Sequence, residues 1–72
     1  MSGKVLRING LEREFPEGKV PETLSDLLNA LEICHATVVA EIDGRIVERK
    51  DFGGTAMVSG QKIELVRFVG GG

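Results

Sequence analysis

Two dipeptides, Asn9-Gly10 and Asp43-Gly44, most constrain how this chain can fold. Each follows a short apolar run and has the residue types of a two-residue type I′ turn, in which both central positions need positive φ. The sequence therefore predicts two β-hairpins, formed by residues 5–8 with 11–15 and by residues 37–42 with 45–48.

One amphipathic helix of about ten residues is predicted between the hairpins. Apolar residues recur there at i, i+3, i+4 and i+7, which places them on one face of a helix. These residues are Leu24, Leu27, Leu28 and Leu31. Thr23 precedes them as an N-cap residue that can accept a hydrogen bond from the Asp26 amide. The stripe is interpreted as core, not as a binding site.

The order of the elements predicts the fold class. A last strand at residues 62–69 follows a loop at residues 49–60. One helix covers only one face of a sheet, so we expect an α+β fold with a mixed four- to five-stranded sheet and the helix on its concave face. The first and last strands are short apolar runs suited to parallel pairing at the centre. This order is that of the β-grasp (ubiquitin-like) fold, with a single domain over residues 1–69.

Composition excludes several classes of protein. The chain has 72 residues, 42% hydrophobic and 28% charged, which is typical of one small globular domain. Its net charge of −2 gives no footprint for nucleic acid. No apolar run suits a membrane span or a signal peptide, so residence in the cytoplasm is the expectation. The single cysteine, Cys34, excludes an internal disulfide and a four-cysteine metal site.

The chain closes on three glycines, Gly70, Gly71 and Gly72. Glycine loses the most conformational entropy on ordering, so we expect residues 70–72 to form a flexible tail unless a partner holds it. Four extended residues span about 13 Å, enough to enter a channel too narrow for side chains. The tail is therefore predicted to present the Gly72 carboxylate to a partner, and a frayed chain end is the alternative.

Two segments resemble the ThiS family of sulfur carrier proteins. Residues 39–49 look like the family's VxxNGxxVxR hairpin, with Asp43 in place of the usual asparagine. Residues 60–72 resemble its ending, which is a turn, a strand and a terminal Gly-Gly, with Gln61 where aspartate is common. The first departure keeps the turn chemistry, and the second concerns hydrogen bonding in that turn. The similarity covers essentially the whole chain.

This resemblance implies a protein substrate rather than an enzyme. An ATP-dependent activating enzyme similar to ThiF would adenylate the Gly72 carboxylate, and a persulfide sulfur would displace AMP to give a thiocarboxylate. A thiazole synthase similar to ThiG would use that sulfur for the thiazole ring of thiamin. Gly70 and Gly71 would lie in the partner's active site, and this chain itself would bind no cofactor and no metal. The alternatives are a related carrier for molybdopterin or another sulfur-containing product, and a ubiquitin-like modifier.

A docking surface is expected on the last strand. If Ile63 faces the helix, strand alternation places Val66 and Phe68 on the opposite, uncovered face. Exposed apolar residues of this kind mark interaction sites, so Val66 and Phe68, with Val39 or Glu41 from a neighbouring strand, are predicted to contact the partners. The alternative is that Phe68 packs over an edge of the core.

Two other features suggest catalysis but fit structural roles better. Cys34 and His35 are adjacent, and neighbours in sequence point to different sides of a helix or strand, so the imidazole is badly placed to take the thiol proton. Cys34 is instead predicted to be a small buried residue, and His35 to lie at the surface or at the helix C-terminus. Gly53-Gly54 lacks the lysine of a phosphate loop and is predicted to be part of a flexible loop.

Overall fold

Two hairpins and a last strand form one five-stranded mixed sheet in the computed structural model, which describes residues 3–68. The strands are β1 (Lys4–Ile8), β2 (Leu11–Phe15), β3 (Val38–Ile42), β4 (Arg45–Val47) and β5 (Lys62–Arg67). Their order across the sheet is β2-β1-β5-β3-β4, with β5 parallel to β1 and antiparallel to β3. The predicted mixed sheet and the parallel pairing of its first and last strands are confirmed. The predicted boundary at residue 69 lies outside the described residues.

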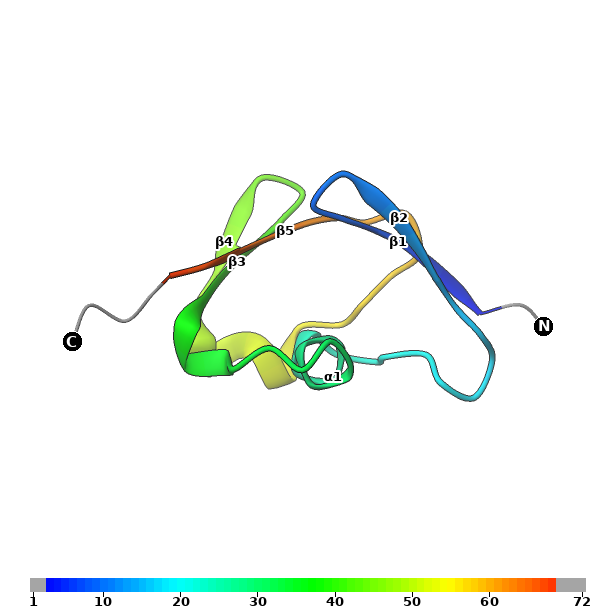
Figure 1. Ribbon diagram of the computed structural model, residues 1–72, viewed down its shortest axis with the longest axis horizontal. Coiled ribbons are helices and arrows are strands. Elements are labelled where there is room, and N and C mark those ends of the chain that lie inside the picture. The colour runs from blue at the N-terminus through cyan, green and yellow to red at the C-terminus, as the bar shows by residue number, and fades with distance from the viewer. Residues whose placement is uncertain (1–2, 69–72) are drawn as a thin grey trace.

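The sheet is arched, and the helix α1 (Leu24–Ala30) lies on its concave side (Figure 1). Thr23 begins the helix as predicted, because its Oγ1 accepts a hydrogen bond from the Asp26 amide at 3.2 Å. The Asp26 carboxylate in turn accepts a hydrogen bond from the Thr23 amide at 3.3 Å. This reciprocal capping box satisfies amides that would otherwise lack a partner in the first turn.

The helix spans seven residues, not the ten or so predicted. Glu32 adopts the left-handed conformation, with φ of 59°. The Ile33 amide donates to the Leu28 carbonyl at 2.9 Å and the Glu32 amide donates to the Asn29 carbonyl at 3.1 Å. These two bonds form a Schellman motif, which reverses the chain and ends the helix. Cys34 follows the reversal and is exposed, so its predicted burial is wrong.

The segment predicted to be a loop at residues 49–60 contains a 3₁₀ helix, Arg49–Gly54. This short helix buries the Phe52 side chain, which is only 2% exposed. Gly53 and Gly54 belong to the helix, so the prediction of a flexible loop is wrong there. A second 3₁₀ turn, His35–Thr37, leads into β3.

The core lies between α1, the 3₁₀ helix and the concave face of the sheet. Its buried side chains are Leu6, Ile8, Phe15, Leu24, Leu27, Leu28, Val38, Ala40, Ile42, Phe52, Met57, Ile63 and Leu65. Within residues 3–68, no helix covers the convex face of the sheet (Figure 1). None of the helices in this part of the chain has the length and apolar character needed to cross a membrane.

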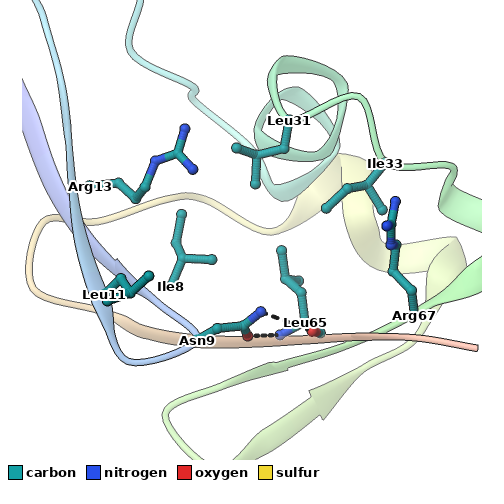
Figure 2. Close-up of a pocket in the computed structure, with 8 residues that line it drawn as sticks. All are labelled: Ile8, Asn9, Leu11, Arg13, Leu31, Ile33, Leu65 and Arg67. Atoms are coloured by element: carbon teal, nitrogen blue, oxygen red, sulfur yellow. Dashed lines mark hydrogen bonds between the residues drawn. The ribbon is translucent and has the colours of Figure 1, made fainter.

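Both hairpin turns hold the central strand β5 through a side chain. Asn9 and Asp43, the first turn residues, have φ of 52° and 50°, and the glycines that follow also have positive φ, so the predicted turns are confirmed. The Asn9 amide pairs with Leu65 twice, accepting from its N–H at 2.7 Å and donating to its carbonyl at 3.2 Å (Figure 2). Asp43 Oδ1 accepts from the Lys62 amide at 3.0 Å. These contacts extend the pairing of β5 beyond the ends of β1 and β3.

Candidate functional site

The convex face of the sheet carries the residues predicted to bind partners. On β5, Ile63 is fully buried and Val66 is 61% exposed, so the strand alternates as expected. Val39 of β3 is directly paired with Val66 and is 42% exposed. Phe68 follows β5 and is 49% exposed, while its amide donates to the Thr37 carbonyl at 3.0 Å. Phe68 is therefore half exposed at the end of the sheet, and its predicted contact with partners stays a prediction.

Ile46 is a further apolar residue of this face that the sequence reasoning missed. It is 71% exposed on β4 and is paired with Glu41 of β3. A two-residue turn fixes this register, so the position was open to prediction from Asp43-Gly44. The four exposed apolar residues of this region form what we call the open-face patch: Val39, Ile46, Val66 and Phe68.

A shallow groove adjoins the open-face patch. Its volume is about 390 Å³, and Val39, Ile46 and Phe68 line it together with His35 and Arg49. Such a groove gives a partner side chain a place to insert, and the guanidinium beside it suits an acidic neighbour on that partner.

Carboxylates flank the open-face patch along β3 and β5. Glu41 is directly paired with Glu64 across the ladder, and neither makes an ion pair within residues 3–68. Two like charges directly opposite each other are unfavourable in the free protein, and a cationic group from a partner would relieve this repulsion. In the described part of the chain, no group of three or more His, Cys, Asp or Glu residues is placed to hold a metal ion.

The predicted attachment site, Gly72, and the tail glycines Gly70 and Gly71 lie outside the described residues. Phe68 is the last described residue, so the open-face patch lies at the end of β5 from which the chain continues. The exposed apolar patch thus lies next to the start of the glycine tail in the sequence.

Cys34 and His35 have different surroundings in the structure. His35 Nε2 lies 3.1 Å from Asn29 Oδ1, and the imidazole lies edge-on to the Phe52 ring with centroids 5.8 Å apart. Cys34 is exposed before the 3₁₀ turn. The imidazole is half-buried, and its contacts with Asn29 and Phe52 hold it in place.

Gln61, which stands where aspartate is common in the family, makes two side-chain hydrogen bonds within its turn. Its side-chain Oε1 accepts from the Val58 amide at 2.7 Å, and its Nε2 donates to the Ala56 carbonyl at 3.2 Å. Gly60 precedes it with φ of 92°, as the turn requires. Glutamine thus supplies both an acceptor and a donor to this turn.

Comparison with known proteins places the fold and the motifs in one family. The family model for the ThiS family matches residues 6–72. A crystal structure of the thiamine biosynthesis protein ThiS from Geobacter metallireducens is 30% identical, with a TM-score of 0.78 over 94% of this chain and 99% of that chain. An NMR solution structure of a thiamine biosynthesis protein from the same organism is 32% identical, with a TM-score of 0.74 over 94% and 87%. No curated protein sequence matches the chain. This chain belongs to the ThiS family.

Proposed function

We propose that this chain is a sulfur carrier of thiamin biosynthesis, acted on by an activating enzyme and not itself a catalyst. The observation that carries the proposal is the family match over residues 6–72, which includes the terminal Gly-Gly. The two solved relatives, both thiamine biosynthesis proteins, support the same role.

The proposed chemistry resides on the Gly72 carboxylate. A carboxylate is a poor electrophile because its charge is delocalised, and adenylation by a ThiF-like enzyme gives it a good leaving group. The terminal sulfur of a persulfide then attacks the acyl carbon, the bond to AMP breaks, and a thiol cleaves the resulting disulfide to leave a thiocarboxylate. A ThiG-like thiazole synthase would take this sulfur, so docking replaces the diffusion of free sulfide.

The partners are proposed to dock on the open-face patch. Val39 and Val66 would form the apolar centre of the contact, Phe68 would lie nearest the tail, and Glu41 would take a cationic group at its margin. Ile46 joins this set because it lies beside Glu41 and is more exposed than the other patch residues.

ATP is proposed to bind to the activating enzyme and not to this chain. Calorimetric titration of ATP into the isolated chain should therefore give no binding heat. Residence in the cytoplasm stays a prediction, and cell fractionation checks it.

Reconstitution with a ThiF-like enzyme, ATP and a persulfide donor tests the proposed chemistry. Intact mass should show the replacement of one oxygen by sulfur at the C-terminus, and a chain without Gly72 should show none. Transfer of that sulfur by a thiazole synthase would assign the thiazole of thiamin as the product. Transfer to a molybdopterin precursor would instead indicate the related molybdopterin carrier. Conjugates to lysine residues would indicate a modifier, and an unchanged mass would overturn the carrier proposal.

A pair of variants tests the proposed docking surface. Val66→Asp places a charge in the open-face patch, whereas Val58→Asp makes the same change at a similarly exposed residue outside the patch. We expect Val66→Asp to weaken binding of the activating enzyme by about tenfold or more, since a buried unpaired charge costs more than 1.4 kcal/mol. Val58→Asp should bind as the natural chain does. Equal losses in both variants would count against the patch.

A further inference from the structure

A second cavity lies on the concave side of the sheet, away from the open-face patch. Its volume is about 430 Å³, within the range of ligand sites. Leu31 and Ile33, which follow the helix, form one wall, and Leu65 of β5 lies opposite them (Figure 2). Leu11 of β2 lines the cavity and is 69% exposed. The Schellman motif after α1 places the Leu31–Ile33 wall above the sheet.

Two arginines stand at opposite sides of this cavity, Arg13 from β2 and Arg67 from β5 (Figure 2). Neither makes an ion pair within residues 3–68. An apolar cavity with cationic sides suits a ligand that has an apolar side chain next to a carboxylate.

The cavity adjoins a strand edge with free backbone groups. The amide of Arg7 on β1 donates to the Gln61 carbonyl, and that of Asn9, which follows β1, donates to the Ile63 carbonyl. Leu6 and Ile8 alternate with these residues, so their backbone groups turn toward β2. In that register Leu6 is opposite Arg13, and the backbone N–H and C=O groups of Glu12 and Glu14 therefore point outward. No described strand lies beyond β2. This edge is open to strand addition.

The charges along β2 determine which kind of strand can pair with its free edge. Strand alternation directs Arg13 to the cavity side and Glu12 and Glu14 to the convex side. A second copy pairing antiparallel about Arg13 would set Glu12 against Glu14 and Arg13 against itself, which is unfavourable. Glu12 also lies 3.8 Å from Arg7, but both side chains are more than half exposed, so this pair is weak and exchangeable. The favoured strand has the opposite pattern, basic-acidic-basic.

We propose that the β2 edge and the adjoining cavity bind an extended segment of a partner protein by strand addition. Basic side chains of the segment pair with Glu12 and Glu14, an acidic side chain pairs with Arg13, and a flanking apolar side chain enters the cavity. This interaction goes beyond the sulfur-carrier role and uses a different face. If the chain does not bind such a segment, the proposed formation of a thiocarboxylate on Gly72 is unaffected.

The test uses a blocked pentapeptide, acetyl-Ile-Lys-Asp-Lys-Ile-amide, titrated into the isotope-labelled full chain and followed by NMR. Amide shifts are expected along Leu11–Phe15 and at Leu31 and Ile33, with hydrogen exchange at Glu12 and Glu14 slowed by about tenfold at saturation. A peptide N-methylated at both lysines cannot donate to the edge and should not bind. The charge-inverted peptide, acetyl-Ile-Glu-Lys-Glu-Ile-amide, should bind on the order of tenfold more weakly.

Matched variants separate the cavity from the overall charge. Arg13→Glu should weaken binding on the order of fivefold and should shift the preference to a peptide with lysine at its centre. Arg45→Glu makes the same charge change on the other edge strand, β4, and should bind normally. Binding that survives N-methylation, shifts confined to the open-face patch, or an equal loss in Arg45→Glu would each overturn the proposal. Thermal melts of both variants verify that the fold is intact.

Discussion

Exchanging the two turn residues that hold β5 compares an amide with a carboxylate in nearly the same backbone setting. The Asn9 side chain both accepts from and donates to Leu65, whereas the Asp43 side chain only accepts, from Lys62. We therefore predict that Asn9→Asp destabilises the fold and that Asp43→Asn leaves its stability nearly unchanged. Both changes keep the side-chain size, and both residue types tolerate the left-handed conformation found at these positions.

The magnitude follows from the lost donor. In Asn9→Asp the Leu65 carbonyl loses its bond from Nδ2 and faces a carboxylate oxygen instead. Leaving a polar group unsatisfied costs about 1–3 kcal/mol, so we expect a loss of that size in the free energy of unfolding. In Asp43→Asn the amide oxygen still accepts from the Lys62 amide, so the change should stay within about 0.5 kcal/mol. For a domain of this size, each kcal/mol shifts Tm by about 4–8 °C.

Thermal and urea unfolding followed by circular dichroism provide the assay. At pH 7, the Tm of Asn9→Asp should lie below that of the natural chain by an amount between several degrees and about 20 °C. The Tm of Asp43→Asn should stay close to that of the natural chain. At acid pH the new carboxyl is protonated and can donate to the Leu65 carbonyl, so the deficit of Asn9→Asp relative to the natural chain should shrink as the pH falls. Equal losses in the two variants, or a deficit that grows at low pH, would refute the reasoning.

Three further predictions address the helix, its end and the tail. Leu28→Ala removes a fully buried side chain and should lower the free energy of unfolding by about 2–5 kcal/mol in urea titrations; an unchanged midpoint would contradict the core assignment. Glu32→Gly relieves the left-handed φ of 59° and should raise stability by up to about 1 kcal/mol in the same assay, whereas a loss would show that the glutamate side chain stabilises the turn. Deleting Gly71-Gly72 should leave the thermal midpoint unchanged, because glycine has no side chain to bury, yet should abolish thiocarboxylate formation seen by intact mass; a large drop in Tm would contradict a purely chemical role.

The predictions that succeeded depend on local chemistry. Asn9-Gly10 and Asp43-Gly44 define their turns because only a few residue types accept positive φ at both positions. Thr23 marks the helix start because its hydroxyl bonds an amide three residues away. With the hairpins and the helix located, the alternation of β5 and the β-grasp arrangement follow from covering one face of a small sheet.

The predictions that failed concern features that lack a recognisable signal in the sequence. The helix was predicted too long because its end is set by Glu32 in a conformation usually taken by glycine, so the sequence lacks the usual stop signal. Cys34 was predicted to be a small buried residue at the end of that helix, but the chain reverses before it and leaves it exposed. The 3₁₀ helix around Phe52 was missed because its ring packs into the core from a segment with no helical periodicity.

For the candidate site, the sequence by itself determined the glycine tail, the family resemblance and the exposed face of β5. Only the tertiary structure decided which side chains join across strands, because register and packing bring together residues far apart in the chain. It paired Val39 with Val66, and it brought Leu31, Ile33 and Leu65 around one cavity beside the free edge of β2. It also set different tasks for the two turn residues, since β5 presents both an N–H and a carbonyl to the Asn9 side chain and only an N–H to that of Asp43.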